Sequence, residues 1–305
     1  MANITAAMVK ELRERTQAGM MDCKKALNET DGDMEKAIEL LREKGLAKAA
    51  KKAGRVAAQG LVKMAFAADG SKAAVVEVNS ETDFVAKNEE FVEFVETLSN
   101  MVLVNEVSEL EAFMAMSYEG EGTVQDALNA KIAKIGENMN VRRFAKCEKD
   151  GTVYVGYTHG AGRIGVIIGL ETEASVEEVT VVGKDVAMQV ASMNPRFVSE
   201  AEVDPEYIES EKRILVQQAL NEGKPADIVE KMVVGRLKKE LKETCLLAQK
   251  FVKDGEISVE QYVNNVAKEI GKAIKVVEMI RYEVGEGIEK KEENFAEEVA
   301  KQMGM

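Results

Sequence analysis

Tryptophan is absent from this chain, and histidine, cysteine and proline are scarce. Among 305 residues there are one histidine, three cysteines and three prolines. The cysteines, Cys23, Cys147 and Cys245, are odd in number and form no C-x-x-C pair. Neither a disulfide framework nor a cysteine metal site is therefore expected, and one histidine cannot make up for the missing ligands. The composition predicts a reducing compartment, no bound metal and no cofactor.

Long apolar runs are also missing. No segment approaches the roughly 18–20 apolar residues of a membrane span, and the N-terminus, MANITAAMVKELRERT, lacks the apolar stretch of a signal peptide. We therefore expect a cytoplasmic protein without a membrane partner. The formal net charge of −13 argues against direct binding of nucleic acid, which requires clustered Lys and Arg.

What is abundant indicates helices combined with some strands. Apolar residues make up 46% of the chain, enough for real cores, and its length favours two or three domains. Ala, Glu, Lys and Met favour helix, whereas Val-rich runs favour strand. The prediction is an α+β protein.

The first 56 residues predict a three-helix domain followed by a basic linker. Apolar residues recur on one face of each helix in residues 4–45, and Gly45 is expected to end the third helix. Such a small core favours binding over catalysis. The basic residues are Lys44, Lys48, Lys51, Lys52 and Arg55. They could be a solvated helix face or linker, or a docking edge for an acidic partner surface.

Two similar β-hairpins follow, each succeeded by a helix. The first spans 60–80, with a turn at Asp69-Gly70, and the second lies near 152–172. Helices are expected at about 89–104, with an apolar stripe from Phe91 to Val102, and at 176–193; another is expected from Thr123, where Thr-x-x-Asp offers a capping box. Matches at an offset of 91 residues suggest a duplicated unit. We assign 57–148 to one core subdomain, and 149–203 with 242–285 to the other.

An inserted helical hairpin is predicted at 204–241, and a C-terminal module at 286–305. Asp204-Pro205 is typical of a helix start, and a narrow apolar stripe in two charged helices favours an antiparallel coiled coil. Its role could be dimerisation, partner contact or none. A helix at 258–271 and a strand around Ile280 and Tyr282 precede the tail, where Phe295, Val299 and Met303 fit a short docked helix.

No motif gives a convincing active site. The only histidine, His159, lies beside Gly160 in a turn between strands, and the glycines there do not form a phosphate-binding loop. His159 could be an exposed turn residue, or it could contact a partner protein.

One connection combines an acid and a large apolar residue. Thr82, Asp83, Phe84 and Val85 lie between a strand ending near Asn79 and a helix starting near Asn88. Phe84 could turn into the domain's own core, with Asp83 capping a turn. Alternatively, Phe84 could be the exposed aromatic anchor of an interface.

The chain resembles the bacterial elongation factor Ts family. The segments that carry the resemblance are 12–27, 77–87, 134–138, 159–160, 223–225 and 280–287. They follow the family's order over nearly the whole chain. The resemblance implies an N-terminal domain similar to ubiquitin-associated domains, a role in protein biosynthesis, and guanine-nucleotide exchange on elongation factor Tu.

The same resemblance implies roles for individual residues. Thr82, Asp83, Phe84 and Val85 would disturb the magnesium site of elongation factor Tu. Other implied partner contacts are His159, Gly160, Lys51 and Lys52. Two other classes stay open: an adaptor without exchange activity, and an enzyme that uses His159 with nearby carboxylates.

Overall fold

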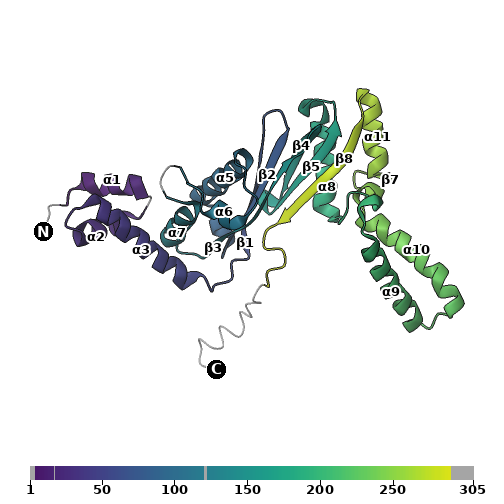
Figure 1. The fold of residues 1–305 in the computed structure, drawn as a ribbon, viewed down its shortest axis with the longest axis horizontal. Helices are drawn as coiled ribbons and strands as arrows, with labels where there is room; N and C mark the ends of the chain where they lie inside the picture. The colour runs from purple at the N-terminus through teal and green to yellow at the C-terminus, as the bar shows by residue number, and fades with distance from the viewer. Residues whose placement is uncertain (1–3, 17, 120–121, 290–305) are drawn as a thin grey trace. The chain divides into compact units, whose positions relative to one another are not determined.

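The computed structural model describes residues 4–16, 18–119 and 122–289 (Figure 1). They form two compact units. The first unit contains the chain up to Lys63, Val76–Ala145 and the segment that starts at Glu283, and the second contains Met64–Val75 and Lys146–Tyr282. The mixture of helices and small antiparallel sheets agrees with the predicted α+β class. None of the described helices is both long and apolar enough to span a membrane.

Three helices begin the first unit. They are α1 (Ala6–Thr16), α2 (Met20–Glu29) and α3 (Met34–Lys52). The Asp33 side chain caps α3 by accepting from the Lys36 N–H at 3.1 Å. The expected apolar face of the second helix is confirmed in α2, where Cys23, Ala26 and Leu27 are fully buried.

The prediction that Gly45 ends the third helix is wrong. α3 continues through Gly45 to Lys52, so most of the basic stretch is helical. A glycine inside a helix costs only about 1 kcal/mol relative to alanine. Gly45 and Ala49 are both buried, and α3 packs against a later helix of the same unit, α7 (Val124–Ile135). Tertiary packing thus outweighs the local helix-breaking tendency.

A three-stranded sheet and four helices follow. The strands are β1 (Gln59–Phe66), β2 (Lys72–Ser80) and β3 (Met139–Glu148), in the order β1-β2-β3. Besides α7, the helices are α4 (Asp83–Ala86), α5 (Glu89–Val104) and α6 (Leu110–Met114). The predicted stripe of α5 is confirmed, since Phe91, Phe94, Val95, Leu98 and Val102 are all buried. α4, α6 and β3 were not predicted from the sequence.

The second unit repeats this strand order. β4 (Thr152–His159) and β5 (Ile164–Thr172) form an antiparallel hairpin, and β8 (Ile274–Glu283) completes the order β4-β5-β8. α8 (Val176–Met193) covers one face, where a Cβ at Gly183 would come within 2.6 Å of the Val155 Cβ. Glycine therefore permits this close helix–strand packing. The shared order supports the duplication, which stays a prediction.

Smaller elements complete the second unit. They are the 3₁₀ turns at Gly160–Gly162, Glu200–Glu202 and Leu246–Ala248, strands β6 (Lys250–Phe251) and β7 (Asp254–Ser258), and helix α11 (Val259–Ile270). β8 begins earlier than expected from the pattern around Ile280. Ile280, Arg281, Tyr282 and Glu283 within it are all half-buried.

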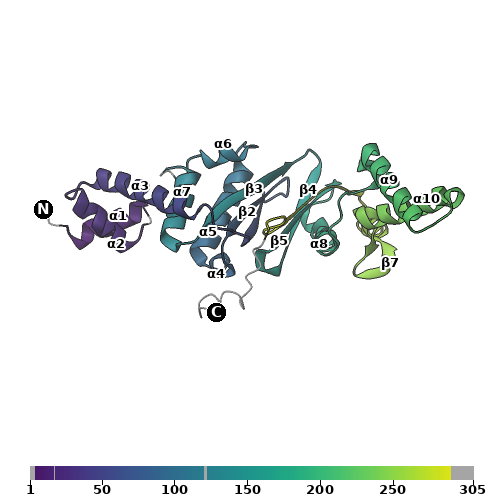
Figure 2. The same cartoon turned by 90° about the horizontal axis from the view of Figure 1, so that it is seen from below.

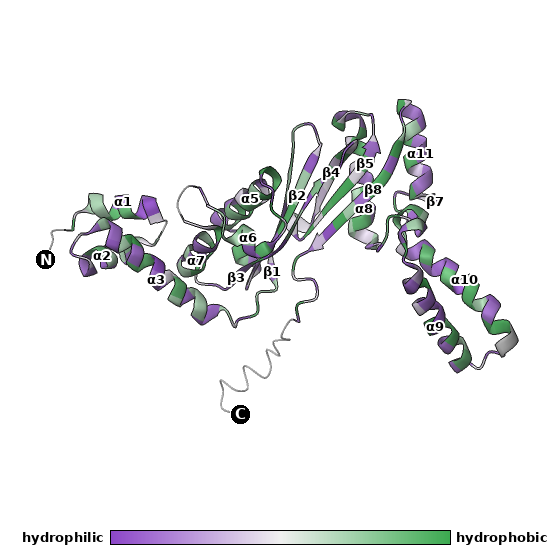
Figure 3. Ribbon diagram, in the orientation of Figure 1, coloured by the Kyte–Doolittle hydropathy of each residue, from purple (hydrophilic) through white to green (hydrophobic). Residues whose placement is uncertain are grey.

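Two antiparallel helices, α9 (Pro205–Asn221) and α10 (Ala226–Thr244), lie side by side in both views (Figures 1 and 2). Asp204 caps α9, accepting from the Glu206 N–H at 2.8 Å. Apolar positions alternate with polar ones along both helices (Figure 3). Their contact is a small cluster of its own, formed by Ala219, Val229 and Val233 with Leu215 and Val216. The predicted helix in the tail, with Phe295, Val299 and Met303, lies outside the described residues.

Candidate functional site

Phe84 projects from the surface of the first unit. It lies on α4, and 81% of its surface is exposed. The interpretation that Phe84 turns into its own core is therefore wrong. The expectation that residues 82–85 form an irregular connection also needs correction, because Asp83–Ala86 is one helical turn. Thr82 at the N-cap position and an acidic residue in the first turn are local signals for this helix.

The two residues that flank the exposed acid and ring are held in place. Val85 is buried. The carboxylate of Glu137 accepts two hydrogen bonds from Thr82, one from its N–H at 3.0 Å and one from its hydroxyl at 2.7 Å. Thr82 thus does not use its side chain to cap α4. Its contact with Glu137 joins two sequence segments that are 55 residues apart.

Asp83 forms an ion pair within the same turn. The Lys87 ammonium donates to its carboxylate at 2.6 Å, and both side chains are more than half exposed. An exposed pair with this spacing contributes only a few tenths of a kcal/mol to the helix. The Asp83 charge is therefore partly compensated but still accessible to a partner.

The turn after α7 also contacts the end of the basic stretch. Asn138 donates from its amide Nδ2 to the Arg55 carbonyl at 2.7 Å, and its backbone N–H donates to Glu81 at 2.5 Å. The Lys52 ammonium donates to the Gly136 carbonyl. Residues 136–138 therefore connect the segment after α3 with the segment that precedes α4.

The basic stretch is largely engaged within the protein. Lys44 pairs with Glu29 at 2.6 Å, and Lys48 pairs with Asp22 at 3.1 Å. Lys51 is exposed. These contacts modify the docking interpretation, since an acidic partner would have to compete with acids of the chain itself.

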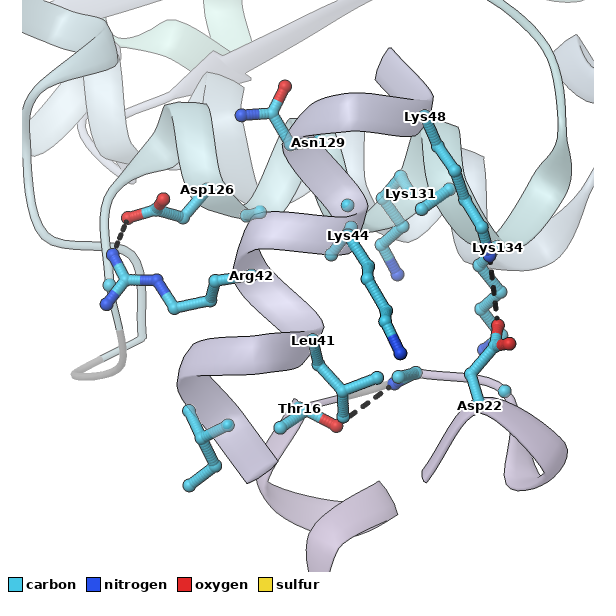
Figure 4. Close-up of a pocket in the computed structure, with 18 of the residues that line it drawn as sticks. Thr16, Asp22, Leu41, Arg42, Lys44, Lys48, Asp126, Asn129, Lys131 and Lys134 are labelled. Atoms are coloured by element: carbon cyan, nitrogen blue, oxygen red, sulfur yellow. Dashed lines mark hydrogen bonds and ion pairs between the residues drawn. The ribbon is translucent and has the colours of Figure 1, made fainter. Parts of the chain in front are cut away.

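A pocket of about 890 Å³ lies among α2, α3, α5 and α7 (Figure 4). The Arg42 guanidinium crosses one side to the Asp126 carboxylate at 2.7 Å, and Lys44 and Lys131 point toward the pocket's interior (Figure 4). Partial burial acts to raise the pKa of Asp126, but hydrogen bonds from Thr123 and the nearby Arg42 outweigh it and lower that pKa. Opposite charges line the pocket together, so it has no strong preference for ligands of one sign.

A buried carboxylate lies under the C-terminal end of the described chain. Glu77 is fully buried on β2, and its oxygens accept from Arg143 at 2.6 Å, from Arg142 at 3.0 Å and from the Gly285 N–H at 2.8 Å. Burial acts to raise the pKa of Glu77, but these donors and Asn79 together lower it. Glu77 thereby fixes the chain just beyond β8.

His159 lies on the second unit, at the end of β4. It is exposed, and its Nδ1 lies 3.0 Å from the Tyr157 hydroxyl. The following turn places Gly160, Ala161 and Gly162 at positive φ, of which only the alanine has a side chain to strain. Among the described residues, no group of three or more His, Cys, Asp or Glu could hold a metal.

Two carboxylates that organise these contacts, Glu137 and Glu77, were not singled out from the sequence. Glu137 lies within the segment 134–138, but no role was assigned to it. Glu77 interrupts the apolar run of β2, and a charged residue within such a run is itself a signal of a paired, buried carboxylate.

Comparisons with known proteins agree over the chain. The model of the family described as elongation factor TS matches residues 81–286. The elongation factor Ts of Clostridioides difficile strain 630 is 61% identical over 303 residues, which cover 99% of this chain and all of that protein. Those of Clostridium perfringens strain SM101 and Clostridium botulinum strain Eklund 17B are 57% and 55% identical, with 99% of each chain covered.

These matches define a translation elongation factor. Within that class, the chain belongs to the elongation factor Ts family. The resemblance inferred from the sequence segments is thereby confirmed.

Proposed function

We propose that this protein is the guanine-nucleotide exchange factor of elongation factor Tu. It binds the GDP-bound partner, disturbs the partner's magnesium site and promotes GDP release, so that GTP can bind. It does so without a chemical active site of its own. The observation that carries this proposal is the 81% exposure of Phe84 on a turn whose flanking residues are held.

The energetics require more than one side chain. A nucleotide bound with nanomolar affinity is held by roughly 12 kcal/mol, and a ten-thousandfold faster release lowers the barrier by about 5.5 kcal/mol. Burial of one phenylalanine contributes roughly 1.5–3 kcal/mol. Phe84 must therefore act within a broad interface.

Displacement of the partner's magnesium ion is a second way to weaken GDP binding. Bound Mg²⁺ neutralises the nucleotide phosphates, so its displacement weakens their hold. Phe84 acts as a wedge near this ion, and Asp83 adds polar contact and negative charge. Thr82 and Val85, which the resemblance also places at the magnesium site, contribute by holding the turn, since Val85 is buried and Thr82 is bonded to Glu137. The coupling is reciprocal. If this protein reduces the partner's affinity for GDP by some factor, GDP reduces the partner's affinity for this protein by the same factor.

The remaining contacts distribute over the two units. Lys51, Lys52 and the three N-terminal helices dock on the GTPase domain of the partner, and His159 with Gly160 supplies a further contact. The accessible ring of His159 and the exposure of Lys51 support these assignments.

Release of a labelled nucleotide tests the proposal. Elongation factor Tu loaded with fluorescent GDP is mixed with excess unlabelled GDP, with and without this protein. Faster release, with the nucleotide chemically unchanged, is the expected result. Binding without faster release would favour the adaptor class, and chemical conversion of the nucleotide would favour an enzyme.

A further inference from the structure

The turn that carries Phe84 cannot maintain its own orientation. α4 has four residues, and Thr82 makes no side-chain cap bond to it. An isolated helix of this length is unstable in water, because the conformational entropy lost on forming the first turn exceeds the stabilisation by its single hydrogen bond. Contacts outside α4 must therefore decide where Phe84 points.

Glu137 supplies a two-point contact of this kind on the N-terminal side. One carboxylate accepts from both the backbone N–H and the hydroxyl of Thr82, at 3.0 and 2.7 Å. This pairing fixes the backbone and the side chain together, and hydrogen bonds to a charged acceptor are about twice as strong as neutral ones. On the other side of Phe84, Val85 is anchored by burial.

Glu137 is itself placed by neighbouring contacts. It directly follows Gly136, whose φ of 92° ends α7. The adjoining Asn138 bonds to Glu81 and to the Arg55 carbonyl. Glu137 is half-buried between Gly136 and Asn138. Its position is therefore set by the short turn that joins α7 to β3.

We propose that Glu137 is a positioning residue for nucleotide exchange: its carboxylate holds Thr82 so that α4 presents Phe84 to the partner in one orientation. This inference rests on the proposed function. Glu137 acts through α4 and need not touch the partner's nucleotide or magnesium ion.

A fluorescence experiment tests the positioning without measuring exchange. The chain contains no tryptophan, so Phe84→Trp introduces a single indole at the tip of α4. In this background Glu137→Ala should lower the steady-state anisotropy of the indole, because the turn gains mobility. The matched control is Glu96→Ala on α5, where the carboxylate pairs with Lys63 at 3.2 Å; it should leave the anisotropy unchanged. Equal anisotropy with and without Glu137 would overturn the proposal.

A double-mutant cycle then connects positioning with exchange. Glu137→Ala should slow fluorescent-GDP release at saturating protein about tenfold, with complex affinity and melting temperature changed little. Glu137→Gln, which keeps one acceptor oxygen, should fall between. In Phe84→Ala protein, the Glu137→Ala change should have no further effect, because a positioning residue has nothing left to position.

The outcomes separate this inference from the proposed function. Independent, multiplicative effects of Glu137→Ala and Phe84→Ala would show that Glu137 does not act through Phe84. Normal release by Phe84→Ala protein would instead refute the wedge itself, and the anisotropy experiment would still decide whether Glu137 holds α4.

Discussion

Phe84 and Phe91 are seven residues apart and have opposite environments. Phe84 is 81% exposed, whereas Phe91 is fully buried on α5. Phe84→Ala should slow GDP release by about ten- to thirtyfold, as for loss of a ~1.5–2 kcal/mol contact, with the melting temperature nearly unchanged. Release and thermal melting are measured on the same sample.

Phe91→Ala is the matched control for this prediction. Truncation of a buried phenylalanine should cost about 3–5 kcal/mol of stability, while release per folded molecule stays normal. If Phe84→Ala instead behaved like this control, the wedge hypothesis would be abandoned.

At Asp83, a change to asparagine removes the charge but keeps the size of the side chain, so the contribution of the charge to exchange can be measured. If its carboxylate helps to displace the partner's magnesium, Asp83→Asn should slow exchange, and more so as the magnesium concentration rises. Lys87→Gln is the comparison, since it removes the 2.6 Å ion pair but keeps the acid; stability should change by less than about 1 kcal/mol. Exchange by Asp83→Asn at the unmutated rate, at low and high magnesium, would exclude a role for the charge.

Glu77 should make the first unit sensitive to acid. Its pKa is lowered in the folded protein, so its stabilisation is fully present above the unfolded value of about 4.3 and is lost as the pH falls through the lower, folded value. Glu77→Gln should therefore reduce the free energy of unfolding by about 3 kcal/mol near neutral pH, because the half-buried Arg142 and Arg143 guanidiniums lose the buried carboxylate that they share.

Denaturation at a series of pH values checks this prediction. The difference between the unmutated protein and Glu77→Gln should shrink from pH 6 toward pH 3, as protonation makes the two alike. A difference that is constant with pH would mean that the charge of Glu77 does not stabilise the fold.

The α9–α10 hairpin illustrates an element with its own small core. Its cluster of Ala219, Val229 and Val233 is separate from the cluster that α8 forms with β4 and β5. Its attachment is at the base, where the Thr244 carbonyl accepts from Arg196 and Phe197, and Tyr207 meets the Phe197 ring.

Replacement of residues 208–241 by a short Gly/Ser link should therefore leave the second unit folded. Thermal melting should stay cooperative, with a melting temperature within a few degrees of the full chain. Leu246→Ala removes a core side chain beside the hairpin. It should lower the melting temperature by more than the hairpin replacement does. Collapse of the shortened protein would refute an independent insertion, and sedimentation of both proteins would test the predicted role in dimerisation.

At the scale of the whole molecule, docking and exchange should be separable. α1, α2 and α3 enclose a core of their own, formed by Val9, Leu12, Cys23, Ala26, Leu27 and Ala37. Deletion of residues 1–50 removes most of this domain but keeps the Lys52 and Arg55 contacts to residues 136–138. Affinity for elongation factor Tu should fall at least tenfold, while circular dichroism shows the remaining units folded.

Deletion of residues 1–56 is the stricter comparison. It also removes the Arg55 carbonyl that Asn138 binds, so it should reduce exchange more than the shorter deletion at equal occupancy. If the protein without residues 1–50 bound as tightly as the full chain, the docking role of the N-terminal helices would be rejected.

Local sequence signals predicted many elements well. The Thr123 capping box before α7, the Asp204-Pro205 start of α9 and the apolar stripe of α5 are all confirmed. In each case the signal lies within a single helix or at its start. α4 and α6 were missed because they are only four and five residues long, and β3 because Arg142 and Arg143 interrupt its apolar alternation. Gly45 was misread because the packing of α3 against α7 overrides its local preference.

The sequence by itself determined the family, the α+β class, most helices and hairpins, and the segment that contains Phe84. Motif order, capping residues and apolar periodicity are properties of neighbouring residues, so they can be read directly from the sequence. Only the tertiary structure decided that Phe84 points outward, that Glu137 holds Thr82 across 55 residues, and that Glu77 gathers Arg142, Arg143 and Gly285. The physical reason is that a side chain's burial and partners depend on distant segments that fold against it, and no local pattern specifies them.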